Sequence, residues 1–114
     1  MIETIVLDYL SEVLSVPVSM EVPEDPPDQF VVIEKTGGGE ENHIKSATLA
    51  IQSIAPSLYE AAVLNENVKT AMDGIAALDA ICRSNLNSDY NFTDTASKRY
   101  RYQAVFDIVY LGGD

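Results

Sequence analysis

The chain has 114 residues, and its 18 acidic and 7 basic side chains give a formal net charge of −11 at pH 7. A surface this negative repels phosphate backbones, so the composition disfavours DNA or RNA binding driven by counterion release. The length predicts one domain, residues 1–114, that buries roughly two-thirds of its unfolded surface without metal or disulfide.

The single cysteine, Cys82, has no second thiol to pair with, and we expect it to be a buried structural residue. No apolar run approaches about 18 residues, and the first residues carry acids without a basic segment. We therefore expect neither a membrane span nor a signal peptide.

The charge is concentrated at the start of the chain. Residues 1–41 hold ten of the 18 acids against one base, Lys35. Such an acidic coat keeps a protein soluble, and it would equally suit the lining of a passage through which DNA slides without adhering.

In chain order, apolar residues at spacings of three and four over residues 2–14 predict an amphipathic helix that Pro17 ends. Alternation over residues 16–22 predicts a short edge strand. Residues 23–28, Pro-Glu-Asp-Pro-Pro-Asp, then predict a stiff acidic loop.

Residues 30–36 predict a strand buried on both faces, and residues 44–54 a long partner strand. Between them, the glycines at 37–39 followed by two acids predict a mobile hairpin tip that is free to take positive φ. A phosphate loop would need a following helix with lysine and serine or threonine, and the two acids would repel the anion. His43, the only histidine, is expected to face solvent.

Ser57 and Glu60 have the spacing of a capping box, so a helix begins there and ends between residues 73 and 78. Its polar residues, Asn65, Glu66, Lys69 and Asp73, are expected to face outward.

Residues 82–92 alternate and predict an amphipathic strand, and residues 93–97 a turn into a closing strand, 98–110. Even positions of the closing strand, from Tyr100 to Tyr110, form the apolar face, and the cationic odd positions face water or a partner subunit. The fold class is therefore α+β, a largely antiparallel sheet of four to five strands with two helices on one face, in the order α-β-β-β-α-β-β.

Catalytic machinery is not evident in this pattern. The carboxylates are scattered over loops and helix exteriors, without a paired histidine, a metal-ligand spacing or a cofactor motif. We expect a non-enzymatic protein without metal or cofactor, and two loop carboxylates acting as acid and base are the remaining catalytic alternative.

Several segments together resemble a known family. They are the Pro-Glu acidic segment at 22–27, FVVIEKTGGG with ENHI, AIQSIAPSLYEAAVLNENVKTAM, and SDYNFTDTASKRYRYQAVFDIVY. Over nearly the whole chain they are similar to the tail terminator proteins of siphophages and of prophages in Gram-positive bacteria, which complete the tail and join it to the head.

The resemblance implies a subunit of a ring, typically of six copies, that caps the tail tube and later meets the head connector. Its partners would be sister copies, the tube protein and the connector, with DNA only as cargo in the lumen, and its location the host cytoplasm and then the virion tail. The candidate assembly residues are Glu24, Asp25, Asp28, Gly37, Gly38, Gly39, Glu40, Glu41, Lys98, Arg99 and Arg101.

On this hypothesis the basic flank at Lys98, Arg99 and Arg101 meets the acidic amino-terminal part of the next subunit. Two alternatives stay open: a neighbouring connector protein of the head–tail joint, and a monomeric acidic adaptor or inhibitor that mimics DNA.

Overall fold

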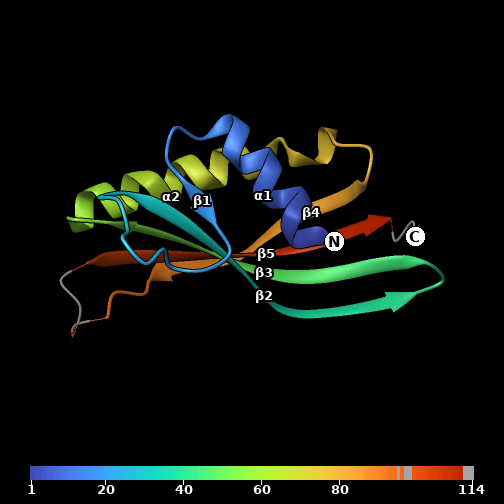
Figure 1. The fold of residues 1–114 in the computed structure, drawn as a ribbon. Coiled ribbons are helices and arrows are strands. Elements are labelled where there is room, and N and C mark those ends of the chain that lie inside the picture. The colour runs from blue at the N-terminus through green and yellow to red at the C-terminus, as the bar shows by residue number, and fades with distance from the viewer. Residues whose placement is uncertain (95, 97–98, 112–114) are drawn as a thin grey trace.

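The computed structural model describes residues 1–94, 96 and 99–111, and it confirms the α+β fold class and the element order. Two helices lie side by side on one face of a five-stranded sheet (Figure 1). The elements are α1 (Ile2–Val13), β1 (Val18–Ser19), β2 (Phe30–Glu41), β3 (Ile44–Ala55), α2 (Leu58–Asp73), the 3-10 turn η1 (Ile75–Ala77), β4 (Ile81–Asn91) and β5 (Tyr100–Leu111).

The spatial order of the strands is β1-β2-β3-β5-β4. All neighbours are antiparallel except β1, which pairs in parallel with β2 at Val31 and Val32 only. The predicted strand over residues 16–22 is thus reduced to two residues, and β4 forms the opposite edge of the sheet.

The core lies between the helices and the sheet. Apolar residues at helical spacing on α1 and α2 are buried against alternate residues of the central strands, as the periodicities predict. The cluster includes Ile2, Val6, Leu10, Leu64, Val68, Leu49, Ile51, Ala104, Phe106, Ile108 and Tyr110. Tyr100, predicted on the apolar face of the last strand, is exposed because it lies beyond this cluster.

Local capping sets the helix boundaries. The Ser57 hydroxyl oxygen accepts a hydrogen bond from the Glu60 backbone N–H at 3.1 Å, which begins α2 as predicted. The hydroxyl in turn donates to the Glu60 carboxylate at 2.9 Å. The helix α2 ends at Asp73, and α1 ends at Val13, ahead of Pro17.

The prediction of a glycine-rich hairpin tip is wrong. Gly37, Gly38 and Gly39 lie inside β2, paired with Thr48, Ala47 and Ser46, and none has a positive φ. The turn is instead made by Asn42 and His43, whose φ values are 52° and 67°. Asparagine tolerates the left-handed region, and a two-residue turn of this kind matches the twist of the strands.

The expected burial of Cys82 is also wrong, because its side chain is exposed. The pairing of β4 with β5 shifts register between Ile81 and Arg83, and again between Leu86 and Ser88. These irregularities interrupt the alternation over 82–92, and the buried residue at the start of β4 is Ile81. None of the described helices is long and apolar enough to cross a membrane.

Replacement of the β3 core residue tests the packing. Leu49 has no exposed surface, so Leu49→Ala should lower the free energy of unfolding by about 2–5 kcal/mol, measured by urea denaturation. Leu86→Ala, at a side chain that is 44% exposed, should cost roughly 1 kcal/mol or less. Equal losses at the two positions would contradict the burial described here.

Candidate assembly surface

The face of the sheet away from the helices is the open face (Figure 1), and polar side chains cross it in a row. Gln52 on β3 donates to the Gln103 side-chain oxygen on β5 at 3.0 Å, and Gln103 donates to the Tyr90 hydroxyl on β4 at 2.7 Å. Directly paired strand residues supply this row, since Gln52 and Tyr90 are both opposite Gln103. It links three strands and satisfies amides that are almost fully buried.

A second row lies nearer the hairpin turn. Thr48 donates to one carboxylate oxygen of Asp107 at 3.1 Å, and Asn87 donates to the other oxygen at 3.0 Å. Both carboxylate oxygens of Asp107 are thus engaged by side chains of the neighbouring strands β3 and β4. The two rows make the open face a hydrogen-bonded, polar surface.

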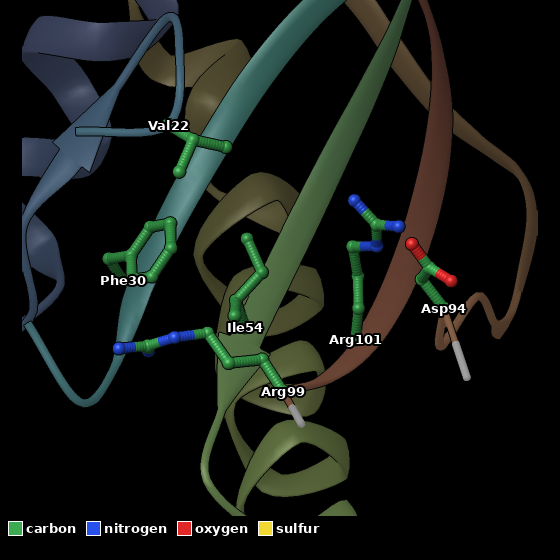
Figure 2. Close-up of a pocket in the computed structure, with 6 residues that line it drawn as sticks. All are labelled: Val22, Phe30, Ile54, Asp94, Arg99 and Arg101. Atoms are coloured by element: carbon green, nitrogen blue, oxygen red, sulfur yellow. The ribbon is translucent and has the colours of Figure 1, made fainter. Parts of the chain in front are cut away.

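An apolar patch interrupts this face at one end. Phe30, Val32 and Ile54 form a small buried cluster separate from the main core. Phe30 and Ile54 line a pocket of about 140 Å³ together with Val22, Asp94, Arg99 and Arg101 (Figure 2). Val22 belongs to the segment at residues 20–29, here called the strap, which connects β1 to β2.

Arg99 fastens the strap. Its guanidinium donates to the backbone carbonyl oxygens of Pro27 at 2.9 Å and of Pro26 and Asp28 at 3.4 Å. The same group lies over the Phe30 ring, 5.6 Å from the centroid. The basic residue predicted to meet the acidic segment of the next subunit thus contacts the acidic segment of its own chain.

Arg101 is also engaged within the chain. It donates to the Phe92 carbonyl oxygen at 3.1 Å and to the Gln52 side-chain oxygen at 3.4 Å, and it lies over the Phe92 ring. Lys98, the third predicted basic residue, lies outside the described residues. The strap acids Glu24, Asp25 and Asp28 are exposed.

The hairpin forms the opposite end of the sheet. Residues 36–46, here called the arm, extend past both helices (Figure 1), and all of them are exposed except Lys45, which is half-buried. The predicted residues Gly37–Glu41 all lie on the arm. The arm begins seven residues after the strap ends, so the two are separate surfaces, roughly 23 Å apart at about 3.3 Å per residue along β2.

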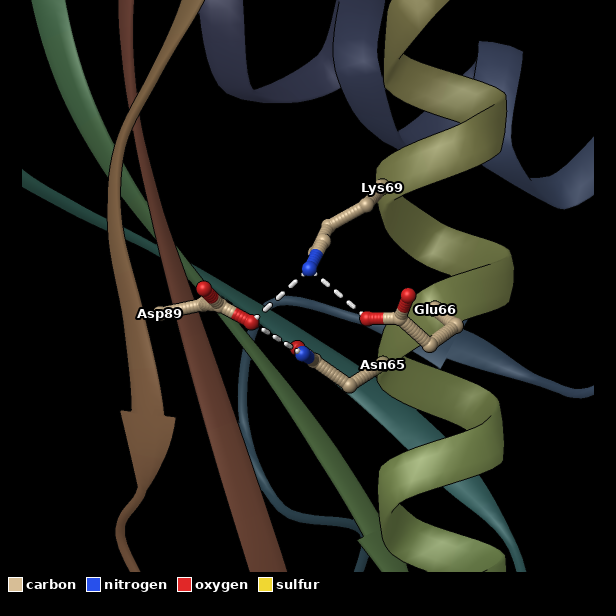
Figure 3. Close-up of polar contacts among 4 residues, drawn as sticks. All are labelled: Asn65, Glu66, Lys69 and Asp89. Atoms are coloured by element: carbon tan, nitrogen blue, oxygen red, sulfur yellow. Dashed lines mark hydrogen bonds and ion pairs between the residues drawn. The ribbon is translucent and has the colours of Figure 1, made fainter.

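A polar cluster that the sequence prediction missed joins α2 to β4 (Figure 3). Asn65, expected to face outward, is 1% exposed, and its amide donates to the Asp89 carboxylate at 2.9 Å. The Lys69 ammonium contacts the same Asp89 oxygen at 3.0 Å and Glu66 at 2.7 Å. The spacing of Asn65, four residues after Ala61 and three before Val68, already placed it on the apolar stripe.

Hydrogen bonds from Lys69 to Glu66, and then to Asp89, raise the pKa of the Lys69 ammonium above its usual value of 10.5. Both carboxylates favour the charged lysine, and this outweighs the small effect of burial. The cluster holds the exposed edge strand against the helix layer.

The described residues form no group of three or more His, Cys, Asp or Glu side chains that could hold a metal ion. The charged groups named above are dispersed between the strap, the arm and the α2–β4 cluster. No protein-family model matches the chain, and no curated protein matches it.

Removal of the Arg99 guanidinium should loosen the strap. In Arg99→Ala we expect the free energy of unfolding to fall by about 1–3 kcal/mol, because hydrogen bonds to three carbonyls are lost. Exposure of Phe30 should raise the fluorescence of a bound hydrophobic dye. Arg83→Ala, which removes the same charge from an exposed position on β4, serves as the control and should change neither quantity.

The Lys69 cluster predicts a specific pH dependence. Because the folded-state pKa lies above the unfolded value, the lysine contributes stability that is complete below about pH 10.5 and is lost as pH rises through the folded value. The difference in unfolding free energy between wild type and Lys69→Met should shrink over that range, measured by urea denaturation between about pH 9 and about pH 12. A difference independent of pH would contradict this assignment, and tyrosine ionisation cancels because it is common to both proteins.

Proposed function

We propose that the protein is a non-enzymatic structural subunit of a phage tail, which forms a ring, with six copies, that caps the tail tube and joins it to the head connector. The single observation that carries the proposal is the arm, the end of the sheet that the chain's own helices leave largely bare. The resemblance of the sequence to tail terminator proteins indicates the assembly, a ring on the tail tube, in which such an arm would contact a neighbouring protein.

The arm belongs to the larger sheet, because β3 is paired with β5 as far as Ile44 and Leu111, and a partner packed on it would cover the side chains and strand edge that the helices leave exposed. The arm also carries apolar surface at its end. Ile44 and Leu111 are paired across β3 and β5 and are 49% and 55% exposed. These side chains offer a neighbouring protein a contact next to the acids Glu40 and Glu41.

The acids support a role beside DNA rather than on it. Glu24 and Asp25 on the strap and Glu40 and Glu41 on the arm are exposed at opposite ends of the sheet. DNA in transit through a ring would be repelled by such groups. A DNA mimic would need its acids in one continuous array, and this separation supports the ring over the mimic.

Electron microscopy of the purified protein mixed with tail tubes tests the proposal. Rings, or tubes with one capped end, are the expected result. A one-to-one complex with a nucleic-acid enzyme, with the tubes left uncapped, would contradict it. Disruption of the gene should give overlong tails, whereas full heads that leak DNA would instead indicate a connector protein.

Charge reversal on the arm should impair assembly without unfolding the monomer. In Glu40→Lys/Glu41→Lys, both changed side chains are exposed, so the unfolding free energy should move by less than about 1 kcal/mol. Capped tubes counted by electron microscopy should fall about tenfold or more, because like charges then meet across the contact.

The matched control is Asp8→Lys/Glu12→Lys, which makes the same charge change at exposed positions on α1. Capping by this variant should stay near the wild-type level. Equal losses in the two double variants would show that net charge, rather than the arm, governs capping.

A further inference from the structure

We propose that neighbouring copies join through the two free edges of the sheet, with β4 of one copy pairing antiparallel with the arm segment of β2 in the next. This inference rests on the proposed function, because it names the contact by which the ring would close. It makes the ring a continuation of the sheet from subunit to subunit.

Both edges carry unused hydrogen-bonding groups. In the described part of the chain, β4 pairs only with β5, and β2 beyond Val32 has a strand partner on one side only. A row of free N–H and C=O groups on an edge strand is a template for another strand. Two such edges on one molecule suffice for head-to-tail association, which closes into a ring when the rotation between copies permits.

The strand directions fit this pairing. The strands β2, β3, β5 and β4 alternate in direction, because each is antiparallel to the next. The outer edge of β4 therefore runs opposite to the outer edge of β2, and a second copy in the same orientation continues the antiparallel sheet.

The register brings opposite charges together. Arg83 lies in the same cross-strand row as Val109, Ser46 and Gly39, and the adjacent row runs from Ile81 to Glu40. Continuing these rows into the next copy sets Arg83 opposite Gly39 and diagonal to the exposed Glu41, which lies two residues further along β2 and therefore on the same face of the sheet. The other ionised residue on β4, Asp89, is already paired with Lys69.

Two of the three arm glycines have no explanation within the monomer, whereas a Cβ on Gly38 would lie 2.9 Å from the Lys35 side chain and 3.2 Å from the Ser46 carbonyl oxygen. A Cβ on Gly37 would approach no atom closer than 4.0 Å, and one on Gly39 would meet only the Ser46 hydroxyl, at 3.4 Å. Neither has a positive φ, yet glycine weakens a strand. Close approach of another backbone is a reason to keep these positions bare.

The edge of β4 offers a segment of matching length. Its register shifts fall between Ile81 and Arg83 and between Leu86 and Ser88, which leaves two regularly paired segments of four residues, and the first of them, Arg83–Leu86, shares its cross-strand rows with the arm glycines. Irregularities of this kind limit indiscriminate edge pairing. A short regular segment opposite a short bare arm makes the contact selective.

The native cysteine provides the test. Cys82 is exposed between the rows of Ile81 and Arg83, so Glu40→Cys in the next copy would lie opposite it. Mild oxidation of assembled Glu40→Cys rings should give a ladder of disulfide-linked oligomers on a non-reducing gel. Glu40→Cys/Cys82→Ser and Asp73→Cys, whose new thiol lies at the end of α2, should give no such ladder.

The outcomes separate the inference from the function. Rings that form without a ladder overturn the edge pairing and leave the proposed function intact, whereas the absence of rings and capped tubes overturns both. Disulfide-linked dimers of the wild-type protein would indicate a symmetric contact between two β4 strands and would overturn the head-to-tail arrangement.

Discussion

The structure is governed by a mismatch between the length of its sheet and the extent of its helix layer. The two helices bury one face of the central strands, and the apolar stripes of α1 and α2 meet that face in a continuous core. The helices leave the arm exposed except at Lys45, which lies near the start of α1, and neither covers the second face (Figure 1). The rest of the sheet surface must therefore be stabilised by contacts other than packing against the helices.

The contacts that stabilise the uncovered sheet surface differ along the strands. In the middle, the rows of Gln52 and Asp107 replace an apolar layer with side-chain hydrogen bonds, so the open face stays ordered without a cover. At one end, the strap and Arg99 shield Phe30. At the other end the described residues leave the arm largely exposed, and this is the surface that we propose for contact with another protein.

The sequence predicted the parts of the fold that follow from periodicity. Helical spacing, the Ser57 cap and the alternation around Phe106 led to the right elements and the right core, because burial selects one face of each. The sequence-based prediction was wrong where strand pairing, rather than the local amino-acid composition, determines the structure. The arm glycines looked like a turn, yet the strand ladder includes them, and a register shift exposes Cys82.

The candidate surface was less predictable, since it depends on contacts between distant segments. The sequence placed Arg99 near the end of the chain and the prolines near its start, and nothing local indicated that they meet. Asn65 was misassigned because polar character was given more weight than its place in the stripe. The acids Glu40 and Glu41, expected in a hairpin tip, lie instead at the end of β2, where both are exposed.

Amide hydrogen exchange, compared between the isolated protein and the assembled ring, tests most directly whether the uncovered end of the sheet is where copies recognise one another. Assembly should slow exchange at amides of the arm and of β4, while the helix layer, already protected in the monomer, should change little. Slowing confined to α1 and α2, with the arm still exchanging freely in the ring, would contradict the account.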